Sequence, residues 1–317
     1  GYLDPEFFLG GTMQLDVAAA ERAITALGEH LGLSLMETAW GIHQVVNEQM
    51  AGAARMHAVE QGKDPRAYPM FAFGGAGPVH AYHVAAILQS PEVIVPLGAG
   101  VTSTVGFLVA PLAFDFVRSY VGRLASLDWN EVHARFVEME AEGRAILVSA
   151  GARDDEITVT RTAELRYVGQ GHEVIVPVPL GNMGNDAADL LNRAFETRYL
   201  ELYGRTASGN PVEAINWRVV TAAPSPVLPL DRLAAQSGSG DLGGAVKGKR
   251  PIYLPESMAM QPVPVYDRYR LPLGVGFDGP AIVEERESTA IIGGGTVRVD
   301  EYRNLIVAMP AGMTNDE

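Results

Sequence analysis

The sequence has 317 residues, of which 47% are hydrophobic, contains no cysteine and carries a formal net charge of −14. These values indicate a globular chain of about two domains and exclude disulfides, thiolate metal sites and cysteine nucleophiles. The negative charge argues against nucleic acid or an anionic membrane as the main partner, because both attract cationic surfaces.

The longest apolar stretch does not have the composition of a membrane span. Residues 101–117 contain Pro111 and Asp115, whereas a spanning helix needs about 20 clean apolar residues. We therefore expect no membrane partner. The lack of cysteine also suits a reducing compartment, so we expect a cytoplasmic location.

Two helices are predicted near the start of the chain. Asp16 can cap the first, which covers residues 16–31. Ser34 and Glu37 have the spacing of a capping box, and the second helix runs from there to about Gln61. Small residues in the middle of the second helix let another backbone approach closely. We therefore expect this helix to be buried in a helix-rich layer.

A strand–helix–strand unit follows. The apolar run 70–73 predicts a strand, residues 78–89 a helix and residues 92–96 a second strand. This order predicts a parallel sheet that is covered on both faces.

The loop Gly74-Gly75-Ala76-Gly77-Pro78 joins the first strand to the helix. Glycine allows a positive φ and lets a ligand reach the backbone. Proline in the first helical turn leaves the helix amides pointing into the loop, where they favour an anion. The loop is neither G-x-G-x-x-G nor a P-loop. A tight turn and a ligand site both remain open from the spacing alone.

Histidines accompany the loop without forming a recognisable metal motif. His80 and His83 share one face of the helix, so His80 could contact a ligand. We expect no metal site, because no H-E-x-x-H motif or carboxylate at ligand spacing accompanies them. No acid, base or nucleophile has a partner that spacing can establish, so the catalytic residues are unknown. Polar residues of the long helix either line a cleft or are solvated: His43, Asn47, Arg55 and His57.

The character of the chain changes after a further helix at 128–150. Residues 157–179 alternate with period two around Gly-Gln-Gly and predict a hairpin. Its first strand is expected to turn Arg161, Glu164 and Arg166 to solvent. The remaining predicted elements are a helix at 184–202, a strand at 212–223 and short strands beyond residue 250.

The predicted fold class is α/β (mixed α+β) with a β-rich C-terminal region. We expect four parts. Residues 1–125 contain the glycine-rich loop, and 126–230 form an α+β region with the hairpin. Residues 231–250, rich in Gly and Ser, form a linker or mobile loop, and 251–317 form a small β-domain.

Several segments resemble a known family. The resemblance rests on five stretches that keep their order along the chain: LDPEFFLGGTMQLD, VVNEQMAGAARMHAVEQGKDPR, FAFGGAGPVHAYHVA, RYVGQGHEVIVPVP and GPAIVEERESTAII. They are similar to the hydantoinase A / 5-oxoprolinase / acetone carboxylase β-subunit family. One departure is Arg303, in DEYRNL, where the family tends to have glycine in a tight turn. We expect a different turn there.

The resemblance implies part of an actin-like, Hsp70-like ATPase lobe that takes ATP and Mg²⁺. In such folds a Gly-Gly loop meets the adenosine, which assigns cofactor binding to Gly74, Gly75, Ala76, Gly77, Pro78 and His80. The family's two Gly-Thr-rich phosphate hairpins do not occur in this sequence. The chain therefore resembles the C-terminal half of such a subunit. The phosphate and Mg²⁺ ligands are expected outside it, and it is expected to be inactive alone.

The family also implies the reaction and the partners. The leading interpretation is an ATP-dependent amidohydrolase of hydantoinase or oxoprolinase type, which phosphorylates a cyclic amide oxygen. Its expected partners are the N-terminal half of the subunit, a hydantoinase B-like subunit or fused domain, and a small-molecule substrate. The alternatives are a ketone carboxylase subunit of acetone or acetophenone carboxylase type, and a non-catalytic assembly module.

Overall fold

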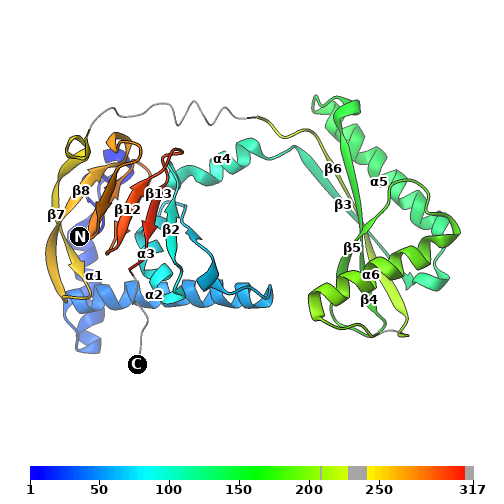
Figure 1. The fold of residues 1–317 in the computed structure, drawn as a ribbon, viewed down its shortest axis with the longest axis horizontal. Coiled ribbons are helices and arrows are strands. Elements are labelled where there is room, and N and C mark those ends of the chain that lie inside the picture. Colours follow the sequence, from blue (N-terminus) through cyan, green and yellow to red (C-terminus); the bar gives the residue numbers. More distant parts are fainter. Residues whose placement is uncertain (208, 228–240, 311–317) are drawn as a thin grey trace. The chain divides into compact units, whose positions relative to one another are not determined.

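The computed structural model describes residues 1–207, 209–227 and 241–310, and these residues form two compact units (Figure 1). The first unit combines Gly1–Phe107 with Leu228–Glu317, and the second consists of Leu108–Val227. The observed fold is of the mixed α/β class, as predicted from the sequence.

The first unit begins with a short 3₁₀ turn, η1 (Phe8–Gly11), and two helices, α1 (Val17–Leu31) and α2 (Leu35–Glu60). The predicted caps are present. The Asp16 carboxylate accepts from the Ala19 amide at 2.8 Å. The Ser34 amide donates to the Glu37 carboxylate at 2.8 Å, and the Glu37 amide donates back to the Ser34 hydroxyl at 3.3 Å. Local capping chemistry was therefore enough to define both helix starts.

The expectation that α2 is buried is wrong for the described residues. Only Thr38, Asn47 and Ala51 of α2 are buried. Large apolar side chains remain exposed along it, with Val45 at 57% and Met56 at 66%. The small residues of α2 indicated a close approach, but only a few positions are covered: Thr38 packs against Gly28 of α1, and Ala51 packs against Val84 and Leu88 of α3.

A five-stranded sheet holds the glycine loop. Its order is β1-β2-β13-β12-β9, and its strands are β1 (Met70–Phe71), β2 (Glu92–Val95), β9 (Gly276–Asp278), β12 (Thr296–Val299) and β13 (Leu305–Ala308). Helix α3 (Gly77–Leu88) links β1 to β2, which pair in parallel as the strand–helix–strand prediction required. The other pairings are antiparallel. Figure 1 shows β13 (red) beside β2 (cyan), so the sheet is mixed because the chain's late strands complete it.

A four-stranded sheet completes the first unit, in the order β11-β10-β8-β7. Its strands are β7 (Val246–Leu254), β8 (Ala259–Asp267), β10 (Ala281–Glu284) and β11 (Thr289–Ile292). Apolar side chains from both sheets and from α3 form one buried cluster, which includes Tyr82, Val93, Val283 and Val307. The remaining short helices of this unit are η2 (Pro65–Ala67), η3 (Ala99–Val101), η7 (Leu242–Ala245) and η8 (Arg268–Arg270). Helix α4 (Thr102–Val109) ends in the second unit.

The second unit is an antiparallel sheet with two helices. The sheet order is β3-β6-β4-β5, and the strands are β3 (Ala113–Arg123), β4 (Thr158–Tyr167), β5 (Val174–Val178) and β6 (Val212–Ala222). Helices α5 (Trp129–Ser149) and α6 (Ala187–Tyr203) contribute Phe136 and Phe195 to its core. The predicted hairpin is confirmed as β4 and β5. Short helices η4 (Leu124–Ser126), η5 (Asp154–Glu156) and η6 (Gly184–Asp186) connect these elements.

Arg161 does not face solvent, contrary to the prediction. It shares the parity of Ala163 and Leu165 and is buried on the inner face of β4. Its guanidinium is paired with Glu140 of α5 and donates to the Gly181 carbonyl at 2.7 Å. The cation also lies 4.7 Å from the ring centroid of Phe136. A buried cation needs such partners, and alternation alone could not reveal them.

The four predicted parts and the two observed units divide the chain differently. Strands from residues 251–317 share a sheet with β1 and β2, and residues 246–250 belong to β7. Of the predicted linker, residues 231–240 lie outside the described residues. The predicted boundaries remain a proposal about domains, to which the structure adds these strand pairings.

The turn at Arg303 also differs from expectation. Arg303 keeps a left-handed backbone with φ +64°. Its amide donates to the Asp300 carbonyl at 3.0 Å, and the Asn304 amide donates to the Asp300 carboxylate at 2.7 Å. The tight turn is therefore present, and arginine adopts the conformation that glycine favours.

Candidate functional site

The glycine loop leaves β1 through a left-handed residue. Gly74 has φ +94°, and its amide donates to the Ala99 carbonyl at 2.8 Å. A Cβ atom at Gly74 or Gly77 would meet nothing within 4 Å, and one at Gly75 would meet only the Glu287 carbonyl, at 3.7 Å. The loop backbone is therefore open on one side. Only Gly74 requires glycine for its conformation, since Gly75 and Gly77 have no positive φ.

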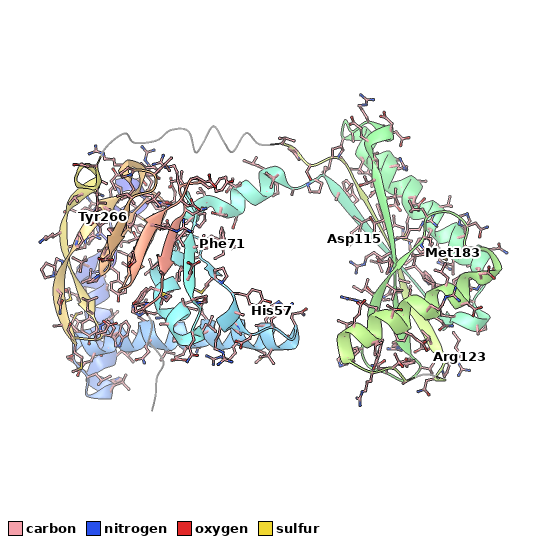
Figure 2. All side chains as sticks on the ribbon, in the orientation of Figure 1. His57, Phe71, Asp115, Arg123, Met183 and Tyr266 are labelled. Atoms are coloured by element: carbon pink, nitrogen blue, oxygen red, sulfur yellow. The ribbon has the colours of Figure 1, made fainter. Side chains whose placement is uncertain are left out.

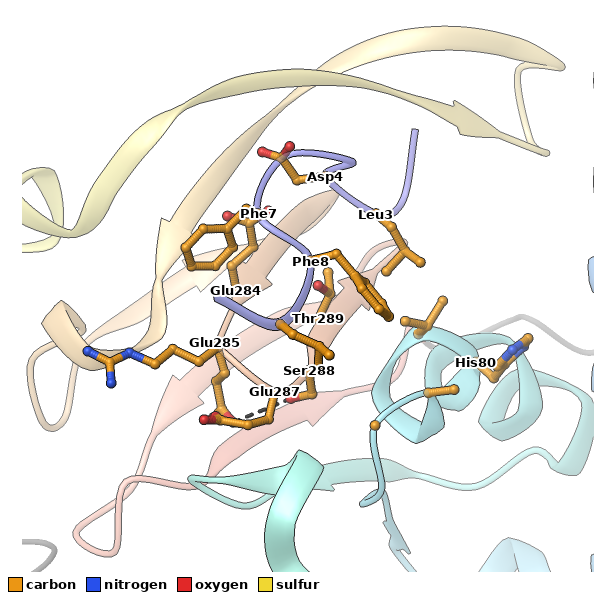
Figure 3. A pocket seen from close by; sticks show the side chains of 15 residues that line it. Leu3, Asp4, Phe7, Phe8, His80, Glu284, Glu285, Glu287, Ser288 and Thr289 are labelled. Carbon is orange, nitrogen blue, oxygen red and sulfur yellow. Dashed lines mark hydrogen bonds between the residues drawn. The ribbon is translucent and has the colours of Figure 1, made fainter. Parts of the chain in front are cut away.

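A cavity of about 330 Å³ adjoins the loop, as Figure 3 shows. Gly75, Ala76 and Val79 line it from the loop and α3. The N-terminal segment 3–9 lines another side with the rings of Phe7 and Phe8. The β10–β11 turn supplies the rest, including Ser288 and Thr289. An apolar cavity with backbone groups along one wall suits a flat ring whose edges are polar.

Helix α3 begins at this cavity without a side-chain cap. Ala76 occupies the N-cap position and makes no side-chain hydrogen bond, and Pro78 stands in the first turn. Pro78 has no amide hydrogen and the Val79 amide donates to the Ala76 carbonyl at 3.1 Å, so it is the helix dipole that favours an electronegative group at this end.

His80 lines the cavity and is held from α2. Its Nδ1 lies 2.8 Å from Oδ1 of the buried Asn47, within hydrogen-bond distance. Its ring stacks on that of His43 with centroids 4.5 Å apart. The hydroxyl of Tyr2 lies 3.2 Å from Nε2 of His83. Of these residues only His80 lines the cavity, and His43 and Asn47 of α2 contact its ring from the other side. The sequence had left open whether the polar residues of α2 line a cleft or are solvated.

The histidine cluster is uncharged at neutral pH. Burial lowers the pKa of His43 to about 4, with smaller contributions from His80 and His83. Burial likewise lowers the pKa of His83 to about 4, and it lowers the pKa of His80. The remaining polar candidates of α2 lie elsewhere: Arg55 is exposed and donates to the Ile87 carbonyl at 3.1 Å, and His57 (Figure 2) is exposed.

Charged side chains that the sequence analysis did not identify hold the N-terminal segment 3–9 beside the cavity. The Glu284 carboxylate is almost fully buried and is paired with both Lys247 and Arg250. Arg250 also reaches Asp4 at 2.8 Å, and the Lys247 ammonium lies 3.6 Å from the ring centroid of Phe7. Asp4 and Phe7 lie more than 200 positions before the other three residues, so no local pattern could have linked them.

A second buried pair was also missed. Glu285 and Arg268 face each other with Oε1 and Nε 3.1 Å apart, and both residues are at most 5% exposed. Glu285 stands in the charged run EERES, which reads as a solvated turn unless its partners are known.

In residues 1–207, 209–227 and 241–310, no group of three His, Asp or Glu side chains could hold a metal ion. Over the same residues, no helix combines the length and hydropathy needed to cross a bilayer.

Comparisons with known proteins agree on one family. A family model described as hydantoinase/oxoprolinase matches residues 1–116, and one described as the hydantoinase/oxoprolinase C-terminal domain matches residues 124–308. Each of the following similarities covers 92% of this chain. The uncharacterized protein MJ0964 of Methanocaldococcus jannaschii is 31% identical, the caprolactamase subunit alpha of Pseudomonas jessenii 27%, and the acetophenone carboxylase gamma subunit of Aromatoleum aromaticum 28%.

Solved structures share the fold. A nucleotide-free acetone carboxylase superposes with a TM-score of 0.74 at 24% identity, and an ATP-dependent caprolactamase from Pseudomonas jessenii with a TM-score of 0.72 at 26% identity. Both similarities cover 98% of this chain and 45% of the other. The chain spans 41% to 42% of the length of the three relatives named above.

Proposed function

The chain belongs to the hydantoinase/oxoprolinase family, and we propose that it is part of an ATP-dependent amidohydrolase subunit that activates a cyclic amide. The family's members include a caprolactamase subunit, and a solved caprolactamase of similar fold is described as ATP-dependent. Phosphorylation of the amide oxygen by ATP would create a good leaving group on a poorly reactive carbon. The observation that carries the proposal is the open glycine loop beside an apolar cavity.

In this proposal the loop receives the adenosine side of ATP. Gly74, Gly75 and Gly77 present backbone to the ligand, because a Cβ atom at any of them would meet at most the Glu287 carbonyl, at 3.7 Å. Gly75 and Ala76 line the cavity, and the buried Pro78 starts the helix behind them. His80 borders the same cavity. Its lowered pKa leaves the ring uncharged, so it suits a neutral base or sugar better than a phosphate. The ligands of Mg²⁺ and of the phosphates are expected outside this chain.

The proposed assembly contains further polypeptide. The relatives are more than twice as long as this chain, and their names describe them as subunits. We therefore include in the proposal a preceding half of the same subunit, a hydantoinase B-like partner or fused domain, a small-molecule substrate and a cytoplasmic location. A ketone carboxylase is the second candidate, because the acetophenone carboxylase subunit is as similar as the caprolactamase subunit, at 28% against 27% identity.

Nucleotide titration tests the binding site. Calorimetry with ADP and adenosine should detect binding to the native assembly that contains this chain. Gly75→Val should weaken it at least tenfold, because the new side chain enters the cavity while meeting only an ordinary contact at Glu287. Gly52→Val is the matched control, since Gly52 also has open space around it but lies on α2 away from the cavity. Equal affinities of wild type and Gly75→Val would remove the loop from the binding site.

A substrate panel tests the reaction. The native assembly should release phosphate from ATP when caprolactam, hydantoin or 5-oxoproline is added. Release that instead requires a ketone together with bicarbonate would assign the carboxylase function. No release with any of these, combined with no nucleotide binding, would favour a non-catalytic assembly module.

A further inference from the structure

The turn between β10 and β11 lies against two glycine-containing loops. Glu285 in this turn directs both carboxylate oxygens at backbone amides that begin η3. Oε1 accepts from the Gly98 amide at 3.3 Å, and Oε2 accepts from the Ala99 amide at 3.1 Å. Gly98 itself is left-handed, with φ +71°. One carboxylate thus fixes the start of the loop that follows β2.

The loop after β2 in turn fixes the proposed binding loop. The Ala99 carbonyl accepts the hydrogen bond from the Gly74 amide at 2.8 Å. Gly100 adds a close contact, since a Cβ atom there would lie 2.3 Å from the Glu287 carbonyl oxygen. An unbroken series of contacts therefore runs from the β10–β11 turn through residues 98–100 to Gly74.

Arg268 completes the arrangement from the other side. Its Nε donates to Glu285 Oε1 at 3.1 Å, and its Nη2 donates to the Val95 carbonyl at 3.2 Å and to the Arg303 carbonyl. Burial lowers the pKa of Arg268 to about 10, which still leaves the guanidinium charged at neutral pH. Ser288 donates to the second oxygen of Glu285 at 3.3 Å (dashed in Figure 3). Each carboxylate oxygen therefore has two donors.

We propose that Glu285, oriented by Arg268, is a positioning residue that holds the glycine loop 74–78 in its binding conformation. The consequence for nucleotide affinity rests on the proposed function, whereas the effect on the loop does not. Glu285 acts through backbone amides and is not a catalytic residue. An ion pair with a purely structural role would need only Arg268. Here both carboxylate oxygens of Glu285 also accept hydrogen bonds, from the amides of Gly98 and Ala99.

The experiment compares three variants of the full chain in its native assembly. Glu285→Gln keeps the shape but removes the charge and turns an NH₂ group toward an amide. Arg268→Met/Glu285→Met removes both charges, and such a replacement restores stability where a single removal does not. Glu140→Gln is the matched control, because it breaks the buried pair with Arg161 in the second unit.

Hydrogen exchange at the amides of Gly74, Gly98 and Ala99 is the first readout, measured relative to amides of β12 and β13 in the same variant. Glu285→Gln and the double variant should exchange at least tenfold faster at these three positions, although only the first should lose thermal stability. Glu140→Gln should leave the three rates unchanged. Unchanged rates in Glu285→Gln, or rates restored in the double variant, would overturn the positioning role.

ADP affinity is the second readout. We expect it to fall at least tenfold in both Glu285 variants and to stay at the wild-type value in Glu140→Gln. If the wild-type assembly binds no adenine nucleotide, the proposed function fails, and the exchange rates still decide whether Glu285 positions the loop. Wild-type affinity in Glu285→Gln despite faster exchange would show that the loop conformation does not matter for binding.

Discussion

Arg303 combines a left-handed backbone with a buried side chain. Its φ is +64° and the residue is only 4% exposed. For a residue other than glycine this conformation costs about 1–2 kcal/mol of free energy, because the Cβ atom crowds the following carbonyl. The side chain offsets this by donating to the Tyr269 carbonyl at 2.9 Å, while its own carbonyl accepts from Arg268. The hydrogen bond to the Tyr269 carbonyl is one that glycine could not make.

Comparing Arg303→Ala with Arg303→Gly separates the two effects. Both variants lose the side-chain hydrogen bond, but only glycine also relieves the backbone. Arg303→Ala should therefore have the lower free energy of unfolding. The difference should be up to about 1 kcal/mol, because the greater freedom of glycine in the unfolded chain cancels part of the gain. Urea denaturation of both variants measures it. An alanine variant as stable as the glycine variant would mean that the turn relaxes.

At the scale of elements, two helical glycines differ in what surrounds them. Gly143 lies in α5 against β6, and a Cβ atom there would stand 2.3 Å from the Thr221 hydroxyl oxygen and 3.0 Å from the Phe116 ring. Gly52 lies in α2, and a Cβ atom there would meet nothing within 4 Å. Glycine is therefore needed in α5 for helix–sheet packing, whereas no packing contact requires it in α2.

The same substitution should have opposite signs at these two positions. Gly52→Ala should raise the free energy of unfolding by about 0.5–1 kcal/mol, because alanine favours the helix. Gly143→Ala gains the same propensity but must displace Thr221, and overpacking of this kind costs about 1–3 kcal/mol. The variant should therefore be destabilised overall. Denaturant midpoints measure both changes. Stabilisation by both substitutions would mean that α5 can move away from the sheet.

At the scale of the whole molecule, short-range signals predicted more than long-range ones. The capping residues Asp16 and Ser34 bond to groups only three residues away. The two strands of the β4–β5 hairpin are joined by a short turn. The sequence therefore reveals both features. The pairing of β13 with β2 joins residues about 200 positions apart, and no short-range pattern in the sequence indicates which strands meet. The same holds for the site: the glycine loop was visible, whereas no pattern in the sequence singled out Glu285 and Arg268, and Glu285 bonds to amides more than 180 positions away.

The second unit is inserted between two segments of the first. It covers residues 108–227, and its first and last strands pair with each other, with Ala113 opposite Ala222. The chain therefore enters and leaves this unit at one place. Its core, built around Trp217, Phe136 and Phe195, draws only on its own residues. A unit with its own core and adjacent ends meets the structural conditions for cooperative unfolding on its own.

Calorimetry of the full chain should accordingly resolve two unfolding transitions. Gly143→Ala should lower the midpoint of one transition by roughly 4 °C for each kcal/mol lost, in keeping with a unit of this size. It should leave the other midpoint in place, because Gly143 belongs to the second unit and the main core of the first unit is built from residues of that unit alone. Arg268→Met should do the reverse, since it leaves Glu285 buried and unpaired in the first unit. If both variants shift a single transition, the two units do not unfold independently.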